Sequence, residues 1–261
     1  MRRRKRAGIR AKARSTRRSN SAEVIPLLFY VLSLAENTKR VVIAIDGPAG
    51  AGKSTIARRL AARLGFTYID TGAMYRAVGL WALRQGLDVA DMHRMEQLAR
   101  AAEIELLPGS KIRLNEEDVT DAIRTPEVSD AASKVSTIPA VRRALVEKQR
   151  ALAERTSVVM EGRDIGTVVF PHADVKIFLD AEPRERARRR HLEAPQEGSL
   201  DQVAVEMRER DQRDRTRAEA PLTQAPDAAY VDSTGLAPDE VEEAILKLVR
   251  ARVTNGKEFS G

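Results

Sequence analysis

The sequence predicts an α/β fold in which helices cover both faces of a central parallel sheet. Short apolar, β-branched runs alternate with stretches of helical periodicity along most of the chain, which is the pattern of a doubly wound sheet. The first run, VVIAI at 41–45, leads directly into a glycine-rich turn and a helix. One stretch, 103–120, instead alternates apolar and polar residues around a Pro-Gly-Ser turn. That alternation predicts an antiparallel hairpin in a small inserted subdomain.

The elements of the first half can be justified one by one. Residues 41–45 are apolar throughout, as expected of a central parallel strand. Ile56, Leu60 and Leu64 then repeat at helical spacing, and Gly65 is placed to end that helix. A short strand at 67–69 precedes a second helix, which has Met74, Val78 and Trp81 on one face.

The second half continues the alternation. Residues 124–154 predict two helices, with Pro126 and Pro139 in their first turns. Further strands are expected at 157–160 and 175–179, each followed by a helix. The last strand, 228–232, precedes a C-terminal helix that begins at Pro238.

The composition excludes several classes of site. The 261 residues suffice for one sizeable core with a small insert. The chain has no cysteine, so it has no disulfide framework, thiolate metal site or cysteine nucleophile. Its three histidines, His93, His172 and His191, are scattered, which argues against a histidine metal site.

The positive charge is concentrated at the N-terminus. Residues 1–40 hold 12 Lys/Arg against 2 Asp/Glu, whereas the other residues hold 33 against 36. Four interpretations of this segment stay open: a signal peptide, an organelle transit peptide, an RNA-binding tract, or an unstructured extension translated from an upstream start codon. Its apolar run VIPLLFYVLSLA is shorter than the ~20 residues that span a bilayer. We expect residues 1–38 to be a disordered extension and the body to show no nucleic-acid signature.

A phosphate-binding motif follows the first strand. Gly47, Gly52, Lys53 and Ser54 fit G-x-x-x-x-G-K-[ST]. Glycines let backbone N–H groups curl around phosphate oxygens, and the helix N-terminus adds its partial positive charge. In such a P-loop the lysine reaches the β- and γ-phosphates and the hydroxyl ligates Mg²⁺.

The P-loop alone does not say what receives the phosphate. A GTPase would need a guanine-reading Asn-Lys-x-Asp, which this sequence lacks, and helicase or transporter ATPases are normally larger. A small kinase needs a second, arginine-rich site for an anionic acceptor that can be closed against water.

Candidates for that second site lie after strands or share a helix face. In an open α/β sheet, ligands bind at the carboxyl ends of the strands. The candidates are Asp70, Thr71, Tyr75 and Arg76 after the second strand; Glu161, Arg163 and Asp164 after the third; Arg186, Arg189 and Arg190 on one helix; and Arg210, Asp214 and Arg217 on another. For the two helices, a solvated surface stabilised by i,i+4 ion pairs is the simpler alternative.

Six stretches in unbroken order carry a family resemblance: IDGPAGAGKST, DTGAMYRA, DAASKVSTIPAVR, EGRDIGTVVFP, VKIFLDA and RDQRDRTRAEAPL. Together they resemble the bacterial cytidylate kinases, over about residues 40–250. The P-loop is generic, whereas the other five stretches are specific to this family among nucleoside monophosphate kinases. The resemblance implies a P-loop three-layer sandwich with a helical lid.

The resemblance also implies residue roles. ATP is held by Gly47, Pro48, Ala49, Gly50, Ala51, Gly52, Lys53, Ser54 and Thr55, with Arg186. CMP or dCMP is held by Thr71, Gly72, Tyr75, Arg76, Ser133, Arg142, Arg163, Asp164, Arg210, Asp214 and Arg217. Of these, Arg76, Arg163 and Arg217 match the arginines that grip the acceptor phosphate. Ser133, Arg142 and Asp164 match the cytosine readers, and Arg210 and Asp214 match the pentose contacts. The expected catalytic set is Lys53, Arg76, Arg163, Arg189 and Arg217.

Domain boundaries and the metal site follow from the same resemblance. The kinase domain is expected over residues 39–261, with a nucleotide-monophosphate-binding insert at about 95–136 and a lid at about 183–200. Ser54 would ligate Mg²⁺, with Glu161 acting through a bound water. Several relatives carry aspartate at the position of Glu161, and the longer carboxylate should still orient a water bound to Mg²⁺.

The implied reaction is phosphoryl transfer from MgATP to CMP or dCMP, giving ADP and CDP or dCDP. A carboxylate at 164 and a guanidinium at 142 suit cytosine, which offers an N4 donor and ring acceptors; the alternative is that Arg142 only decorates a helix surface. We expect a cytoplasmic monomer that uses Mg²⁺ and engages neither nucleic acid through its body nor a membrane. The rival functions are a kinase for another small anion and a nucleic-acid-binding ATPase that uses the basic tail.

Overall fold

The computed structural model describes residues 40–193 and 198–255. The expectation for residues 1–38 and part of the expected lid, 194–197, lie outside the described residues. Within the described body, a five-stranded sheet is the central layer, and its strand order is β2-β6-β1-β7-β8. All neighbouring strands are parallel. The predicted doubly wound sheet is therefore confirmed.

The strands of this sheet lie close to their predicted positions. Their bounds are Val42–Asp46 for β1, Thr67–Asp70 for β2, Val158–Gly162 for β6, Val175–Asp180 for β7 and Ala229–Asp232 for β8. β1 and β6 are almost fully buried, as expected for strands covered on both faces.

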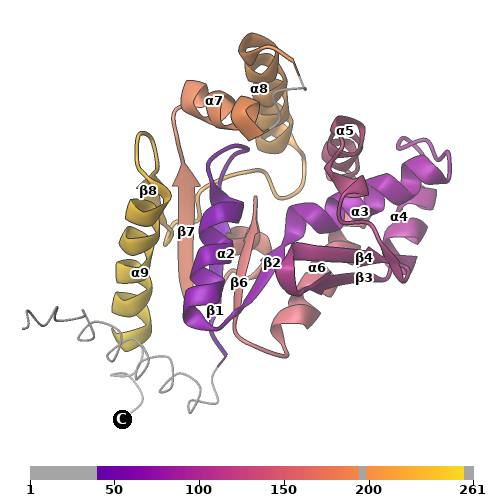
Figure 1. The fold of residues 1–261 in the computed structure, drawn as a ribbon. Coiled ribbons are helices and arrows are strands. Elements are labelled where there is room, and N and C mark those ends of the chain that lie inside the picture. The colour runs from indigo at the N-terminus through magenta and orange to yellow at the C-terminus, as the bar shows by residue number, and fades with distance from the viewer. Residues whose placement is uncertain (1–39, 194–197, 256–261) are drawn as a thin grey trace, which may run out of the picture. The chain divides into compact units, whose positions relative to one another are not determined.

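Helices cover both faces of the sheet (Figure 1). On one face α2, Lys53–Leu64, lies beside α9, Pro238–Asn255. On the other face α6, Pro139–Ala153, contributes Val146 and Ala153 to a cluster with strand residues such as Ala44 and Met160. The predicted helix end at Gly65 is confirmed, because this residue has φ 68° and its N–H donates to the Ala61 carbonyl.

The helix expected after the third strand is absent, and that prediction was wrong. β6 leads into a single π-helical turn, η3, Ile165–Val169. The Asp46 carboxylate at the end of β1 accepts hydrogen bonds from the N–H groups of Ile165 and Gly166, at 2.8 and 2.7 Å. These bonds hold the chain against the sheet, and Ile165 and Val169 join the core cluster on the face that α6 covers.

The predicted hairpin is confirmed. β3, Ile104–Leu107, and β4, Lys111–Leu114, are antiparallel, and β5, Glu117–Asp118, adds a third strand. The turn between β3 and β4 is η1, Pro108–Ser110. Around this small sheet lie α3, Thr71–Arg84; α4, Met92–Ala101; η2, Ala122–Arg124; and α5, Pro126–Val135.

α3 and α5 approach each other very closely. A Cβ atom at Gly79 on α3 would lie 3.0 Å from the backbone nitrogen of Ala132 and 3.3 Å from the Ala131 side chain on α5. No side chain fits between the two backbones without displacing α5 by a few tenths of an ångström.

Two further helices lie beyond the carboxyl end of β7 (Figure 1). They are α7, Pro183–Glu193, and α8, Leu200–Thr216. Among the described helices, none has the length and apolar character that a membrane crossing requires.

Candidate active site

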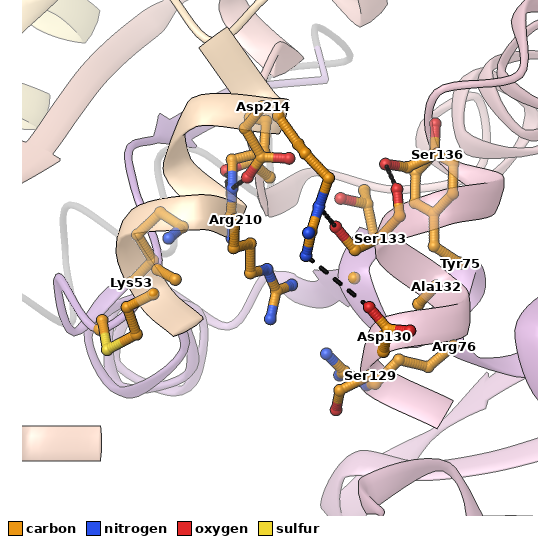
Figure 2. Close-up of a pocket in the computed structure, with 18 of the residues that line it drawn as sticks. Lys53, Tyr75, Arg76, Ser129, Asp130, Ala132, Ser133, Ser136, Arg210 and Asp214 are labelled. Atoms are coloured by element: carbon orange, nitrogen blue, oxygen red, sulfur yellow. Dashed lines mark hydrogen bonds and ion pairs between the residues drawn. The ribbon is translucent and has the colours of Figure 1, made fainter. Parts of the chain in front are cut away.

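A pocket of about 610 Å³ opens at the carboxyl ends of β1, β2 and β6. The P-loop and the start of α2 line one side, and α3 and α5 line the other. α8 lines the space between them, and Figure 2 shows Arg210 and Asp214 of this helix between Lys53 on one side and Ser133 and Asp130 on the other. The parallel sheet thus brings its strand ends to one edge, as the doubly wound pattern predicts.

The P-loop side is built around Lys53. Gly50 and Gly52 adopt the left-handed conformation, with φ 73° and 89°, which lets the loop turn into α2. Lys53 is buried, and its Nζ donates to the Pro48 carbonyl at 2.6 Å. Burial and the nearby Arg163 guanidinium lower the pKa of Lys53 to about 7. Because these surroundings disfavour the charged form of Lys53, an anion bound in the pocket would strongly stabilise its ammonium group.

Not every predicted ATP-binding residue faces the pocket. Ala49, Gly50, Lys53 and Ser54 line it, whereas Gly47, Pro48, Ala51, Gly52 and Thr55 do not. Gly47 has a different reason to be glycine, since a Cβ atom there would come within 1.9 Å of the Leu179 carbonyl oxygen.

Glu161 stands between the two sides. It lies in β6 and accepts a hydrogen bond from the Tyr68 hydroxyl at 2.6 Å, and a further hydrogen bond links it to Ser54. Burial and the neighbouring Asp70 carboxylate raise the pKa of Glu161. Oxygen donors of this kind suit Mg²⁺ when it is shared with phosphate oxygens and water. Among the described residues, no three acidic or histidine side chains gather as a self-sufficient metal site.

All eleven residues predicted to bind the acceptor line the pocket: Thr71, Gly72, Tyr75, Arg76, Ser133, Arg142, Arg163, Asp164, Arg210, Asp214 and Arg217. They come from α3, α5, α6, the end of β6 and α8. Asp70 caps α3 by accepting from the Ala73 N–H at 2.8 Å, and its other oxygen holds Arg76 at 3.0 Å. The structure therefore brings together side chains that lie up to 146 positions apart in the sequence.

Besides Arg76, two further acceptor-side arginines donate hydrogen bonds to carboxylates. Arg163 Nε donates to Asp214 at 2.8 Å. Arg142 donates to Asp164, and its guanidinium also lies 5.6 Å from the centre of the Tyr75 ring. Arg142 is buried, so the interpretation of Arg142 as surface decoration is wrong.

Three buried guanidinium nitrogens find no hydrogen-bond partner within the described residues: Arg76 Nε, Arg210 Nε and Arg217 Nη2. Arg217 Nη2 does lie 3.5 Å from an oxygen of Asp164. Burial and the Arg163 charge lower the pKa of Arg210 to about 10. Buried donors normally have partners, so this cluster is suited to an anionic ligand.

Arg186 and Arg189, the two arginines expected in the lid, make contacts within the protein. Arg186 is buried and donates to the Ala49 carbonyl at 3.0 Å and to Asp211 at 2.6 Å. Arg189 donates to Glu185 at 2.8 Å and to Ser233. Neither lines the pocket, whereas Arg190 does. The roles predicted for Arg186 and Arg189 toward ATP stay predictions.

Sequence reasoning missed one arginine and one strand-end acid. Arg213 lines the pocket and donates to Ser133 at 3.1 Å. The sequence could have indicated Arg213, because position 213 is one turn after Arg210 on the same helix. Asp46 precedes the P-loop, but its hydrogen bonds to η3 depend on a contact across 119 positions that no local pattern reveals.

A phosphate-binding loop that faces a separate arginine-lined recess, on a parallel sheet, defines a P-loop kinase with a small acceptor. The family model described as cytidylate kinase matches residues 43–251. The chain belongs to the cytidylate kinase family.

Individual proteins that are similar to this chain are also named cytidylate kinases. The chain is 73% identical over 227 residues to the cytidylate kinase of Solibacter usitatus, covering 85% of this chain and 97% of that protein. It is 51% identical to the cytidylate kinase of Carboxydothermus hydrogenoformans, covering 79% and 96%. It is 50% identical to that of Geobacillus kaustophilus, covering 82% and 99%.

Proposed function

We propose that this pocket transfers the γ-phosphoryl group of MgATP to CMP and dCMP, giving ADP and CDP or dCDP. Membership of the cytidylate kinase family supports ATP-dependent phosphorylation of CMP. Family membership alone does not assign the use of dCMP, the metal or the residue roles. We argue these from the pocket. The observation that carries them is the division of one pocket between a P-loop with Lys53 and a recess with three guanidinium nitrogens that have no hydrogen-bond partner among the described residues.

Lys53 and the P-loop backbone would hold the donor. The Lys53 ammonium would exchange the Pro48 carbonyl for the β- and γ-phosphates, which are stronger partners because they are charged. Ser54 and Glu161 would hold Mg²⁺, Ser54 through its hydroxyl and Glu161 through a bound water. When bound, Mg²⁺ neutralises charge on the β- and γ-phosphates.

Arg76, Arg163 and Arg217 would hold the acceptor phosphate. Guanidinium groups suit this role better than ammonium groups, because they can donate two parallel hydrogen bonds to one phosphate. With both phosphates held, an acceptor oxygen attacks the γ-phosphorus in line, and the bond to the ADP oxygen breaks. The protein contributes positioning and charge neutralisation and needs no covalent intermediate.

The base would be read by Asp164, Arg142 and Ser133. Asp164 can accept from the cytosine N4 amine, and Arg142 can donate to a ring acceptor. Uracil would set its O4 oxygen against the carboxylate and its N3–H against the guanidinium. The pentose would lie beside Arg210 and Asp214. The expected monomeric state stays a prediction.

A coupled assay of ADP release with a panel of nucleoside monophosphates tests this proposal. CMP and dCMP should be the best acceptors, with kcat/KM values roughly 30-fold or more above the value for UMP and also above the values for AMP and GMP. A better acceptor outside the cytidine nucleotides would support the rival kinase activity and contradict the proposal. Salt-dependent RNA binding by residues 39–261, with no monophosphate accepted, would support the nucleic-acid-binding ATPase instead.

A further inference from the structure

Arg213 connects α8 to α5 along the wall of the pocket. Its Nε donates to the Ser133 hydroxyl oxygen at 3.1 Å, and its Nη2 lies 3.8 Å from a carboxylate oxygen of Asp130. Figure 2 shows Ser133 and Asp130 close together on the side opposite Lys53, with dashed lines to the arginine that bridges to them. Both Arg213 and Ser133 line the pocket.

The direction of the hydrogen bond limits what the Ser133 hydroxyl can do. A guanidinium has five N–H donors and no acceptor, whereas a serine hydroxyl has one donor and two acceptor lone pairs. Because Arg213 occupies one lone pair, the Ser133 hydrogen must point to a different group. Among the described residues no acceptor is found for that hydrogen, and Ser133 itself is buried except where it faces the pocket.

We propose that Arg213 is a positioning residue for base recognition, which turns the Ser133 hydroxyl so that its hydrogen faces a ring acceptor of the bound cytosine. The inference rests on the proposed function, because it assigns Ser133 to the base. Arg213 acts through Ser133 and does not itself need to contact the nucleotide. Ordering the hydroxyl before the base arrives reduces the conformational freedom lost on binding.

A simpler role for Arg213 would be to tether α8 to α5 through Asp130. The two side chains are 39% and 50% exposed and lie 3.8 Å apart, and an exposed pair of this kind contributes little to stability. The 3.1 Å bond to buried Ser133 is therefore the stronger link between the two helices. The two roles predict different results when Asp130 and Ser133 are changed separately.

The test is a double-mutant cycle in the full-length protein with Ser133→Ala, Arg213→Met and the double variant. Arg213→Met keeps the aliphatic stem of the arginine and so preserves its packing. Arg215→Met is the matched control, since Arg215 is an exposed arginine on the same helix that does not line the pocket. Asp130→Asn tests the tether. For each variant, kcat and the KM values for CMP and ATP are measured with MgATP, and CMP binding is measured by calorimetry without ATP.

Each single change at 133 or 213 should lower kcat/KM for CMP by about 3- to 10-fold, as expected for one hydrogen bond. The loss should appear mainly in the KM for CMP, with the KM for ATP within twofold of the wild-type value. The kcat/KM of the double variant for CMP should lie within about twofold of that of the less active single variant, because both changes remove the same interaction. Arg215→Met and Asp130→Asn should stay within twofold of wild type.

Multiplicative losses in the double variant, of about 10- to 100-fold, would overturn the inference while leaving the proposed function intact. A loss in Asp130→Asn equal to that in Arg213→Met would also overturn it, in favour of the tether. Failure of the wild-type enzyme to phosphorylate CMP would instead refute the proposed function, and this result cannot be mistaken for the other two.

Discussion

The Arg142 guanidinium donates to the Asp164 carboxylate, and both side chains are buried at the wall of the acceptor recess. The second oxygen of Asp164 lies 3.5 Å from Arg217 Nη2. Asp164 is thus held from two sides before any nucleotide binds. If Asp164 reads the base, as proposed, a carboxylate fixed in this way would penalise a wrong base, because its side chain is not free to turn away.

Changing either member of this pair should therefore reduce base selectivity. Each buried mismatch costs about 1–3 kcal/mol, so two mismatches predict a wild-type preference for CMP over UMP of roughly 30- to 10⁴-fold. Arg142→Met and Asp164→Asn should narrow this ratio, mainly by lowering kcat/KM for CMP. Arg143→Met is the matched control, because Arg143 is 58% exposed on the same helix and pairs with Glu219. A ratio unchanged in both variants would mean that these residues do not read the base.

Lys53→Ala should lower kcat by at least about 100-fold, which is typical for the loss of one charge-stabilising donor. The fold should survive, since the buried ammonium of Lys53 makes its only direct hydrogen bond among the described residues to the Pro48 carbonyl. Circular dichroism and the Tm report the fold, and a coupled assay reports turnover. Lys247→Ala, at an exposed position of α9, controls for the loss of a lysine. Near-normal turnover in a folded variant would contradict the assignment of the P-loop.

Deletion of residues 1–38 should leave kcat/KM for CMP and ATP within about twofold of the full-length values. All pocket-lining residues fall between Ala49 and Arg217, and the family match begins at residue 43. The two proteins are compared at equal concentration, with the Tm as a check on folding. A large loss of activity at an unchanged Tm would show that the basic segment contributes to the site.

Asp46 should make the stability of the protein depend on pH between about 4 and 6. Burial raises the pKa of its carboxyl from 3.8 to about 6, against the opposing effect of the two N–H groups of η3. In this range the folded state binds more protons than the unfolded state, so the stabilisation from Asp46 is complete below pH 3.8 and is lost as the pH rises through 6. The free energy of unfolding of the wild type, relative to Asp46→Asn, should fall by up to about 3 kcal/mol from pH 4 to pH 7. Urea unfolding of both proteins measures this difference, and parallel pH curves would rule it out.

Local patterns predicted most of the fold and most of the acceptor recess. The strand at 41–45, the helix end at Gly65 and the first-turn prolines all depend on near neighbours in the chain, and the structure confirms them. The turn η3 was missed because its N–H groups donate hydrogen bonds to Asp46, which is far away in sequence and holds the turn in place. The direction of the Arg186 side chain could not be predicted either, since it depends on how α7 packs against Ala49 and α8.

The contact between α3 and α5 lets a residue far from any ligand control the dimensions of the recess. A methyl group at Gly79 would displace α5 by a few tenths of an ångström, and α5 carries Ser133, which lines the pocket. The position of this pocket wall is therefore set from behind. A substitution at position 79 would thus act as a fine adjustment of the space available to the acceptor. A screen limited to residues that contact the nucleotide would overlook position 79, because the substitution leaves every such residue chemically unchanged.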